Sequence, residues 1–320
     1  MPTKSRRTAR GSSQRALGRA DAARAALPSR QRQRSSQWRR WLLGLAGFAA
    51  IAVVAIVGYL AHGGLGSGQD GPTPWARLGT RDVHSLAFDP GDSQHLFFGH
   101  HSGLLESRNG GRSWQPSALS GADAMNIRPA RDNTLQVAGH NVYVESTDGG
   151  AHWAPTANDL PGLDLHAFTV DPADPKHAWA WSVGYGLFES TDRGRHWAIR
   201  QVGDWPVLVA TDADGAAGLI GVSSRGLAKS MDGGQNWTPL ANPGGQVASL
   251  AASPDGNLLY AGTSTGLKRS DDGGLTWRAT AFTGLALTVA MVGSGTVAVV
   301  DDSTRFFRSD DGGATFGPPH

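Results

Sequence analysis

Side chains able to bind a ligand lie in predicted loops, or at the starts of predicted strands, of this 320-residue chain. Histidine, aromatic and arginine side chains occur there, where equivalent segments of the chain carry Ser, Thr and Gly. Loops that depart from a surrounding pattern in this way commonly carry function. We predict that these residues form one ligand-binding face, made of His84, His100, His101, His140, Asn141, His166, Tyr185, Trp205, Arg225 and Arg305.

The histidines raise the question of a metal site, because neutral imidazole is the commonest protein ligand of transition metals. The sequence has no His-x-His or His-Glu-x-x-His spacing, and the neighbours His100 and His101 would point in different directions. A polar ligand-binding surface is therefore preferred to a metal site, and the prediction is no metal. There is also no glycine-rich phosphate loop, so no cofactor is expected.

An internal repeat supplies the elements that must position these residues. The motif Ser-x-Asp-x-Gly-x-x-Trp, here called the box, is complete in four copies, while a fifth has Asn109 for Asp and a sixth ends in Phe316. Successive box serines lie 39, 44, 40, 40 and 39 residues apart. The motif residues are Ser107, Asn109, Gly111, Trp114, Ser146, Asp148, Gly150, Trp153, Ser190, Asp192, Gly194, Trp197, Ser230, Asp232, Gly234, Trp237, Ser270, Asp272, Gly274, Trp277, Ser309, Asp311, Gly313 and Phe316.

Each unit contains four short stretches typical of strands, separated by Gly, Pro, Asn and Asp clusters typical of turns. Four strands in about forty residues is the pattern of a β-propeller blade. Only Gly317 to His320 follow the last box, while Trp75 to Thr80 resembles the segment after each box tryptophan. We therefore predict an all-β, six-bladed β-propeller over 75–320, with the N-terminal strand closing the last blade.

The box residues have structural roles in this prediction. Glycine supplies the positive φ of a tight hairpin without steric penalty. The Asp carboxylate accepts hydrogen bonds from turn N–H groups with the Ser hydroxyl assisting, and Asn109 can do the same through its amide oxygen. Trp packs a large apolar surface beside the turn. Catalytic and metal-binding roles are not expected for them.

The segment before the repeats predicts a membrane anchor. Residues 1–40 carry twelve Lys/Arg and one acid, a net charge of +11, and form a predicted disordered arm. Residues 41–61 contain no charged side chain and are long enough for one transmembrane helix. The positive-inside rule then leaves the amino terminus in the cytoplasm, and 62–74 form a Gly-rich tether to a propeller outside the cytoplasmic membrane.

Alternatives remain for these segments. The apolar run could be a cleaved signal peptide, and Arg39-Arg40 before it resembles a twin-arginine export signal, but an uncleaved anchor fits its length better. The basic arm could bind nucleic acid. The simpler interpretation is that it sets topology and contacts anionic lipid, and no nucleic-acid partner is expected. The chain has no cysteine, so no disulfide stabilises the propeller.

Residues from about 75 to 316 resemble the Asp-box, or BNR, repeat β-propellers of the sialidase-like superfamily. That superfamily includes sialidases and other glycosidases, the sortilin propeller and a photosystem II assembly factor. Its small membrane-anchored bacterial members are called glycosyl hydrolase-like. The resemblance implies that the box hairpins lie on the face opposite the active site. It is specific for the fold and nearly silent on activity, because one fold hosts many functions.

A sialidase-like activity would need a Tyr nucleophile activated by Glu, with three arginines and an Asp. The only glutamates, Glu106, Glu145 and Glu189, each directly precede a box serine, which the resemblance places on the wrong face. A glycosidase with two aspartates remains open, because such enzymes need only a suitably spaced pair of carboxylates. The weak candidates for catalysis are Asp164, Asp204, Asp301 and Asp302.

These observations favour a membrane-anchored extracytoplasmic module that binds a protein or a cell-surface glycan. The alternative is a glycoside hydrolase of the exo-sialidase-like type, and the chain is not predicted to be an enzyme. A third possibility within the binding class is an assembly factor for a membrane complex. The expected partners are the membrane, through the anchor and basic arm, and a protein or glycan ligand.

Overall fold

The computed structural model describes residues 74–213 and 215–317. The predicted arm at 1–40, the anchor at 41–61 and the tether up to residue 73 lie outside the described residues. Within the described part, no helix is both long and apolar enough to cross a membrane.

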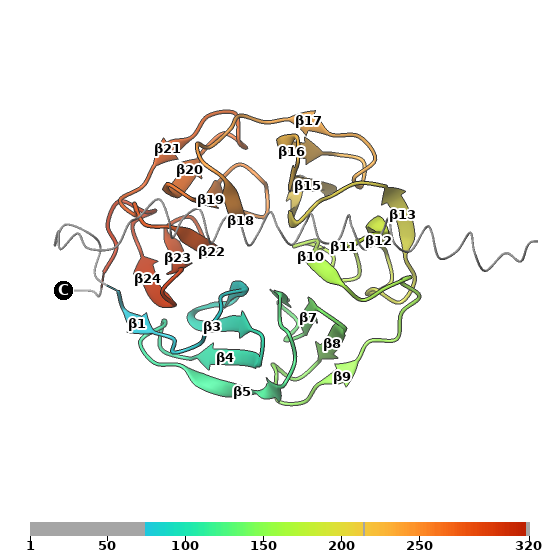
Figure 1. Ribbon diagram of the computed structural model, residues 1–320, viewed down its shortest axis with the longest axis horizontal. Helices are drawn as coiled ribbons and strands as arrows, with labels where there is room; N and C mark the ends of the chain where they lie inside the picture. Colours follow the sequence, from blue (N-terminus) through green and yellow to red (C-terminus); the bar gives the residue numbers. More distant parts are fainter. Residues whose placement is uncertain (1–73, 214, 318–320) are drawn as a thin grey trace, which may run out of the picture. The chain divides into compact units, whose positions relative to one another are not determined.

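The described residues form six four-stranded antiparallel sheets arranged as blades around a common axis (Figure 1). The innermost strands of neighbouring blades contact one another all the way round the ring, and β1, β5, β9, β13, β17 and β21 form its outer rim (Figure 1). Blade 1 consists of β2 (Ser85–Asp89), β3 (Asp92–His100), β4 (Gly103–Ser107) and β5 (Gln115–Ser120), and blade 2 of β6 (Asn126–Pro129), β7 (Leu135–Gly139), β8 (Val142–Ser146) and β9 (Ala154–Pro155). Blade 3 consists of β10 (Leu165–Val170), β11 (Ala178–Ser182), β12 (Gly186–Ser190) and β13 (Ala198–Gln201), and blade 4 of β14 (Val207–Ala213), β15 (Ala216–Ser223), β16 (Gly226–Ser230) and β17 (Thr238–Pro239). Blade 5 consists of β18 (Val247–Ala252), β19 (Leu259–Thr263), β20 (Gly266–Ser270) and β21 (Arg278–Ala279), and blade 6 of β22 (Ala286–Val292), β23 (Thr296–Asp301), β24 (Arg305–Ser309) and β1 (Ala76–Arg77).

The sixth blade is completed by the N-terminal strand, which confirms the predicted ring closure. β1 pairs antiparallel with β24 through Ala76 opposite Phe306 and Arg77 opposite Arg305. Backbone bonds from Trp75 N to Phe306 O (2.8 Å) and from Leu78 N to Thr304 O (2.9 Å) extend the pairing. The strand is shorter than the predicted segment 75–80. It nevertheless covers the edge of β24, which would otherwise leave backbone groups unpaired.

The boxes form the hairpin turns that end the third strand of each blade, with the predicted hydrogen bonds. In blade 5, Ser270 Oγ donates to Asp272 Oδ1 (2.7 Å) and accepts from Gly274 N–H (2.8 Å). Asp272 Oδ1 also accepts the N–H of Thr276 (2.9 Å). The glycine of the box motif has φ between 77° and 94° in all six copies. In the first box, Asn109 Oδ1 accepts the N–H of Ser113 (2.9 Å), as predicted.

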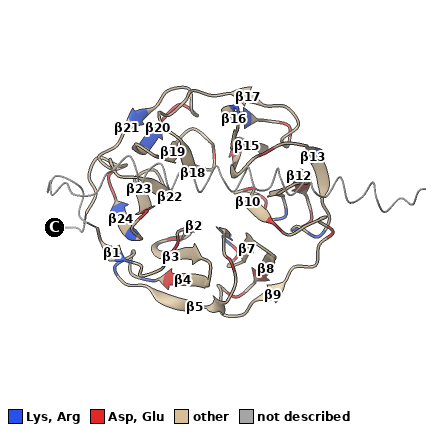
Figure 2. Ribbon diagram, viewed as in Figure 1, with Lys and Arg blue, Asp and Glu red and all other residues tan. Residues whose placement is uncertain are grey.

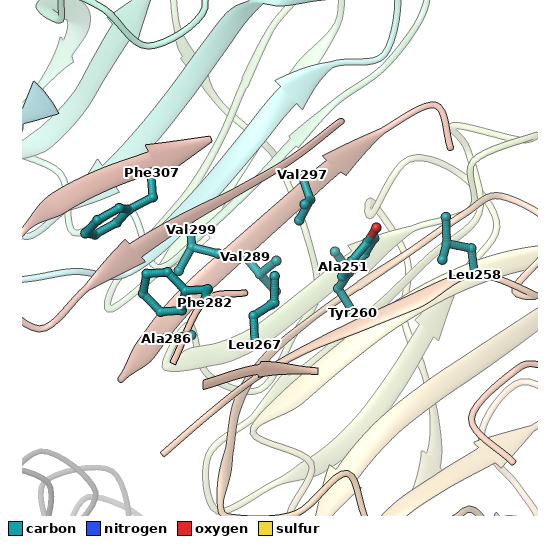
Figure 3. Close-up of a cluster of buried hydrophobic side chains, with 10 residues drawn as sticks. All are labelled: Ala251, Leu258, Tyr260, Leu267, Phe282, Ala286, Val289, Val297, Val299 and Phe307. Carbon is teal, nitrogen blue, oxygen red and sulfur yellow. The ribbon is translucent and has the colours of Figure 1, made fainter. Parts of the chain in front are cut away.

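Apolar side chains fill the spaces between blades. Figure 3 shows one such cluster between blades 5 and 6, which includes Tyr260 and Leu267 of blade 5, Val289, Val299 and Phe307 of blade 6, and Phe282 of the loop that joins the two blades. A second cluster joins blade 6 to blade 1, with Phe306 packed among side chains of β2 and β3. Each such fully buried side chain contributes about 1.5–3 kcal/mol. The blades are therefore held to one another mainly by apolar packing.

The box aspartates make stability depend on pH in the acid range. Hydrogen bonds from the Thr276 side chain and backbone lower the pKa of Asp272 to about 2. Hydrogen bonds from His152 and Asn236, each four residues further along the chain, likewise lower the pKa of Asp148 and Asp232 to about 2. Because these folded-state values lie below the ordinary value of 3.8, the stabilisation is present above about pH 4 and is lost as the pH falls towards 2.

The variant Asp272→Asn tests this dependence, because it cannot ionise. We expect Asp272→Asn to unfold at a lower temperature than the wild type at pH 5, and the difference to shrink as the pH is lowered to 2. Thermal melts followed by circular dichroism at pH 5, 4, 3 and 2 measure it. A difference that stays constant over that range would show that the charge of Asp272 contributes nothing.

Candidate functional site

Histidine and aspartate side chains from blades 1, 2 and 3 meet at the end of the propeller opposite the boxes. They come from the leading loops, which precede the innermost strands β2, β6 and β10, from the start of β10, and from the β3–β4 and β7–β8 turns. In the β7–β8 turn, the backbone of His140 forms an isolated β-bridge with that of Asp164, in the loop before β10. We call this group the polar cluster; it consists of Asp82, His84, His101, Asp123, His140, Asp164 and His166.

The first half of the polar cluster lies between blades 1 and 2. His84 Nε2 is 3.1 Å from His101 Nδ1 and 3.0 Å from Asp123 Oδ1. Asp82 accepts hydrogen bonds from the ring Nδ1 and from the backbone N–H (3.2 Å) of His101. Burial is the main reason why the pKa of His84 is lowered, and the nearby Asp123 only partly opposes it. This ring is therefore held in its neutral form over a wider pH range than an exposed histidine.

The second half lies between blades 2 and 3. His140 Nδ1 is 2.6 Å from Asp123 Oδ2, and His140 Nε2 is 2.9 Å from His166 Nε2. Asp164 Oδ1 lies 3.2 Å from both of these Nε2 atoms. Burial tends to raise the pKa of Asp164, but His166 and His140 outweigh it, so the pKa is below its usual value. The arrangement joins carboxylates to imidazole nitrogens and suits a cation or a hydrogen-bond donor.

Equivalent positions of the repeat supply the polar cluster. Asp82, Asp123, Asp164 and Asp204 occur at intervals of 41, 41 and 40 residues, one in each leading loop of blades 1 to 4. His101 and His140 are likewise equivalent residues of the β3–β4 and β7–β8 turns. Sequence reasoning found the histidines and Asp164 but missed Asp82 and Asp123. The signal that could have found them is this second forty-residue period, which is weaker than that of the boxes.

Other residues predicted for the ligand-binding face surround the cluster without joining it. His100 ends β3, accepts the N–H of Ser102 at Nδ1 (3.3 Å), and has its pKa lowered chiefly by burial. Asn141 has φ of 56°, so its place in the turn follows from its tolerance of the left-handed region. Tyr185 and Arg225 are exposed in the corresponding turns of blades 3 and 4.

The structure corrects the prediction for Trp205. Its ring is only 6% exposed and stacks on Trp237 at 3.7 Å between ring centres, and its Nε1 donates to Gln201 Oε1 (3.1 Å). Trp205 is therefore part of the apolar packing between blades 3 and 4, and a ligand cannot reach its face. The position of Trp205 in a loop favours a binding role, but large aromatic side chains bury most of their surface when an apolar neighbour is available.

Of the aspartates proposed for catalysis, Asp301 is paired with Arg305, away from the polar cluster. Arg305 Nε donates to Asp301 Oδ2 (2.6 Å), while Asp301 Oδ1 accepts the N–H groups of Ser303 and Arg305. Burial raises the pKa of Asp301, yet its oxygens are used in capping the β23–β24 turn. Asp302 and Asp204 are exposed. Only Asp164 joins the polar cluster.

The glutamates lie on β4, β8 and β12, the strands that lead into the boxes, where acidic positions on β4 and β8 are red in Figure 2. Glu189 accepts hydrogen bonds from His177 Nε2 (2.8 Å) and Arg200 Nε (2.6 Å). Glu106 is 2.7 Å from His95 Nε2. These partners belong to the box end of the blades, so no glutamate of the described residues is part of the polar cluster.

Fold and site together define a class: a six-bladed Asp-box propeller of the sialidase-like type, with a histidine–aspartate cluster on the face away from its boxes. This confirms the resemblance found in the sequence. The family model described as "Photosynthesis system II assembly factor YCF48" matches residues 73–317. Because the match spans most of the chain, the protein belongs to this family.

Similar solved structures include "YCF48 bound to D1 peptide", with 20% identity, 76% of this chain and 82% of that chain covered, and a TM-score of 0.47. "YCF48 from Cyanidioschyzon merolae" has 21% identity, coverages of 76% and 87%, and a TM-score of 0.47. A chain of "Crystal structure of Nidogen/Laminin Complex" has 12% identity, coverages of 71% and 94%, and a TM-score of 0.58, which supports the propeller fold alone. No curated protein matches the sequence significantly.

Proposed function

We propose that this protein is a binding module for another protein and acts in the assembly or maintenance of a membrane complex. The observation that carries the proposal is membership of the assembly-factor family over residues 73–317, nearly the whole described propeller. Family membership favours a protein ligand over a glycan. A binding function requires only a surface that recognises the partner, so it does not require a pair of catalytic carboxylates.

In this proposal, the partner binds at the face that bears the polar cluster. His101 and Asp164 expose 55% and 49% of their side chains there, and Tyr185 in the β11–β12 turn is 37% exposed. The chain after residue 40 carries a net charge of −9, which favours a partner segment with basic side chains. Several lysines and arginines of the propeller lie instead on β16, β20, β21 and β24, in blades 4 to 6 (Figure 2).

Location outside the cytoplasm and anchoring in the membrane are part of the same proposal. They rest on the apolar segment at 41–61 and on the twelve basic residues before it. An anchored propeller would meet the external segments of membrane proteins at high effective concentration, because the tether confines it to the membrane surface.

Photo-crosslinking in cells tests the proposed face. A photoreactive phenylalanine analogue is placed at Tyr185, and, as a matched control, at Leu275, an apolar side chain that is 67% exposed in the fifth box. We expect discrete protein adducts of the full-length chain from position 185 and few from 275, because the boxes lie at the opposite end of the strands. Adducts in equal yield from both positions, or none from 185 while the chain binds a glycan array, would contradict a protein partner at this face.

A further inference from the structure

We propose that His140, Asp164 and His166 form a binding site for a divalent transition-metal ion of the Zn²⁺ type. The site lies in the second half of the polar cluster, between blades 2 and 3. It is independent of the proposed protein partner, because the metal would be bound by these three side chains whether or not a partner is present.

The three ligand atoms have the spacing of a metal's first coordination sphere. The two Nε2 atoms are 2.9 Å apart, and each is 3.2 Å from Asp164 Oδ1. Zn²⁺ binds histidine nitrogen and carboxylate oxygen at about 2.0–2.2 Å in a tetrahedral arrangement, which places neighbouring ligand atoms about 3.3 Å apart. The observed triangle is therefore close to one face of a zinc tetrahedron.

The triangle brings three atoms that can donate an electron pair to a metal into one place. Asp123 Oδ2 is 2.6 Å from His140 Nδ1, so the carboxylate holds the proton on Nδ1 and leaves the lone pair of Nε2 directed at the site. Asp164 Oδ1 is a second acceptor; it is buried and lies 3.2 Å from the Nε2 atoms of both rings. One cation placed between these three atoms would interact favourably with all of them.

Asp123 and His140 form a carboxylate–histidine pair of the kind often found at metal sites. A metal-binding histidine commonly donates its other ring N–H to a carboxylate, which fixes the tautomer and makes the ligand more basic. His166 is positioned by packing, because its side chain is only 6% exposed and its ring meets that of Trp181 edge-on at 5.7 Å. The site is thus preorganised on two sides before an ion arrives.

One side of the site is open to solvent. Asp164 and His140 expose 49% and 25% of their side chains, while the Oδ1 that faces the rings is buried. Two histidines and one carboxylate with a free position is the ligand set of sites where the metal also binds water or an external ligand. An ion here could accept a further ligand from solvent or from a bound molecule.

The preceding pair of blades provides an internal comparison. His101 takes the place of His140 and Asp123 that of Asp164, but Met125 stands where His166 would be. At that junction His101 Nδ1 donates to Asp82, and Asp123 contacts both His84 and His140, so Asp123 is shared between two histidines of different blades. Asp82, His84 and His101 also lie close together there, but His84 comes from the loop before β2, in the first blade of its pair, whereas His166 belongs to the second blade of its pair. Within residues 74–213 and 215–317, only the junction of blades 2 and 3 combines both histidines and the aspartate at these equivalent positions.

Metal binding to the purified full-length chain tests the inference. After treatment with a chelator and desalting, the protein is titrated with ZnCl₂ by calorimetry and with CoCl₂ by visible absorption. We expect one equivalent of Zn²⁺ and the visible absorption of four- or five-coordinate Co²⁺. The variants His140→Ala, Asp164→Asn and His166→Ala should each lose this equivalent, and Asp123→Asn should weaken binding about 10–100-fold.

His152→Ala and His196→Ala are matched controls. Each removes a histidine that is 90% or 79% exposed and lies beside a box aspartate, at 2.6 Å and 2.5 Å respectively. These variants should bind Zn²⁺ like the wild type. Asp164→Asn and His140→Ala alter partly exposed side chains, so they keep the test valid if His166→Ala fails to fold. Absence of Zn²⁺ binding to the wild type, or unchanged binding in both of these variants, would overturn the inference.

Discussion

Replacing Gly111 by alanine should lower the free energy of unfolding by about 2–5 kcal/mol. Gly111 has φ of 94°, and a Cβ built on it would lie 2.1 Å from Cε1 of Phe306, whose ring is fully buried. A left-handed conformation costs an L-residue about 1–2 kcal/mol. Overpacking a core adds about 1–3 kcal/mol. Urea unfolding of the variant and the wild type, followed by tryptophan fluorescence, measures the difference.

Gly121→Ala separates the two contributions to that loss. Gly121 has φ of 70°, but a Cβ there would meet no atom within 4 Å. We expect this variant to lose only the conformational part, about 1–2 kcal/mol. Equal losses in both variants would mean that the contact with Phe306 is relaxed at no cost. That outcome would contradict a tightly packed junction between blade 1 and blade 6, where the ring closes.

The blades could be predicted from the sequence because each box carries its own turn chemistry. Ser, Asp and Gly are needed at fixed positions in one hairpin, so the local sequence contains the whole signal. The closing strand was predicted for a related reason, since Trp75 and the residues after it match the segments that follow the other boxes. Strand lengths could not be predicted in this way, because pairing with a neighbouring strand decides where an edge strand ends; β1 has only two residues.

The polar cluster could be predicted only in part, because its members come from three blades. His140 and His166 are 26 residues apart and belong to different blades, so a search for short ligand spacings along the chain could not detect them. Asp123 could not be singled out from the sequence, because aspartates are common in turns. Trp205 was assigned to the surface, since the sequence does not show that Trp237 lies beside it. Side-chain neighbours across blades depend on the tertiary structure.

The repeat explains how such a cluster can arise without disturbing the fold. Leading loops and second-to-third-strand turns lie at the end of each blade away from the box, so their residues carry little of the blade's packing. Met125 and His166 occupy equivalent positions of the repeat, where a leading loop meets the innermost strand of its blade, and both are compatible with a well-formed blade. The boxes and the apolar clusters keep the blades in place, while the opposite face is free to change its chemistry.

The second large effect is expected at the junction of blades 3 and 4. Trp179 of β11 is completely buried, in a cluster with Leu187 and Leu219. Trp179→Ala removes the whole indole from a site that the rigid sheets cannot refill, so we expect a loss of about 3–5 kcal/mol in the free energy of unfolding. Urea unfolding monitored by circular dichroism measures it without relying on the tryptophan signal that the substitution changes.

Phenylalanine substitutions at Trp179 and Trp181 show whether packing or polarity governs this junction. Trp179 Nε1 has no hydrogen-bond partner among the described residues, whereas Trp181 Nε1 donates to Gly203 O at 2.7 Å. Both substitutions remove the same atoms, but only Trp181→Phe leaves a carbonyl without its donor. That loss costs about 1–3 kcal/mol, so Trp181→Phe should be the more destabilising by this amount. If Trp179→Phe proves equally harmful, the buried indole N–H must have a partner, such as a water molecule between the blades, and its satisfaction must contribute to the stability of the ring.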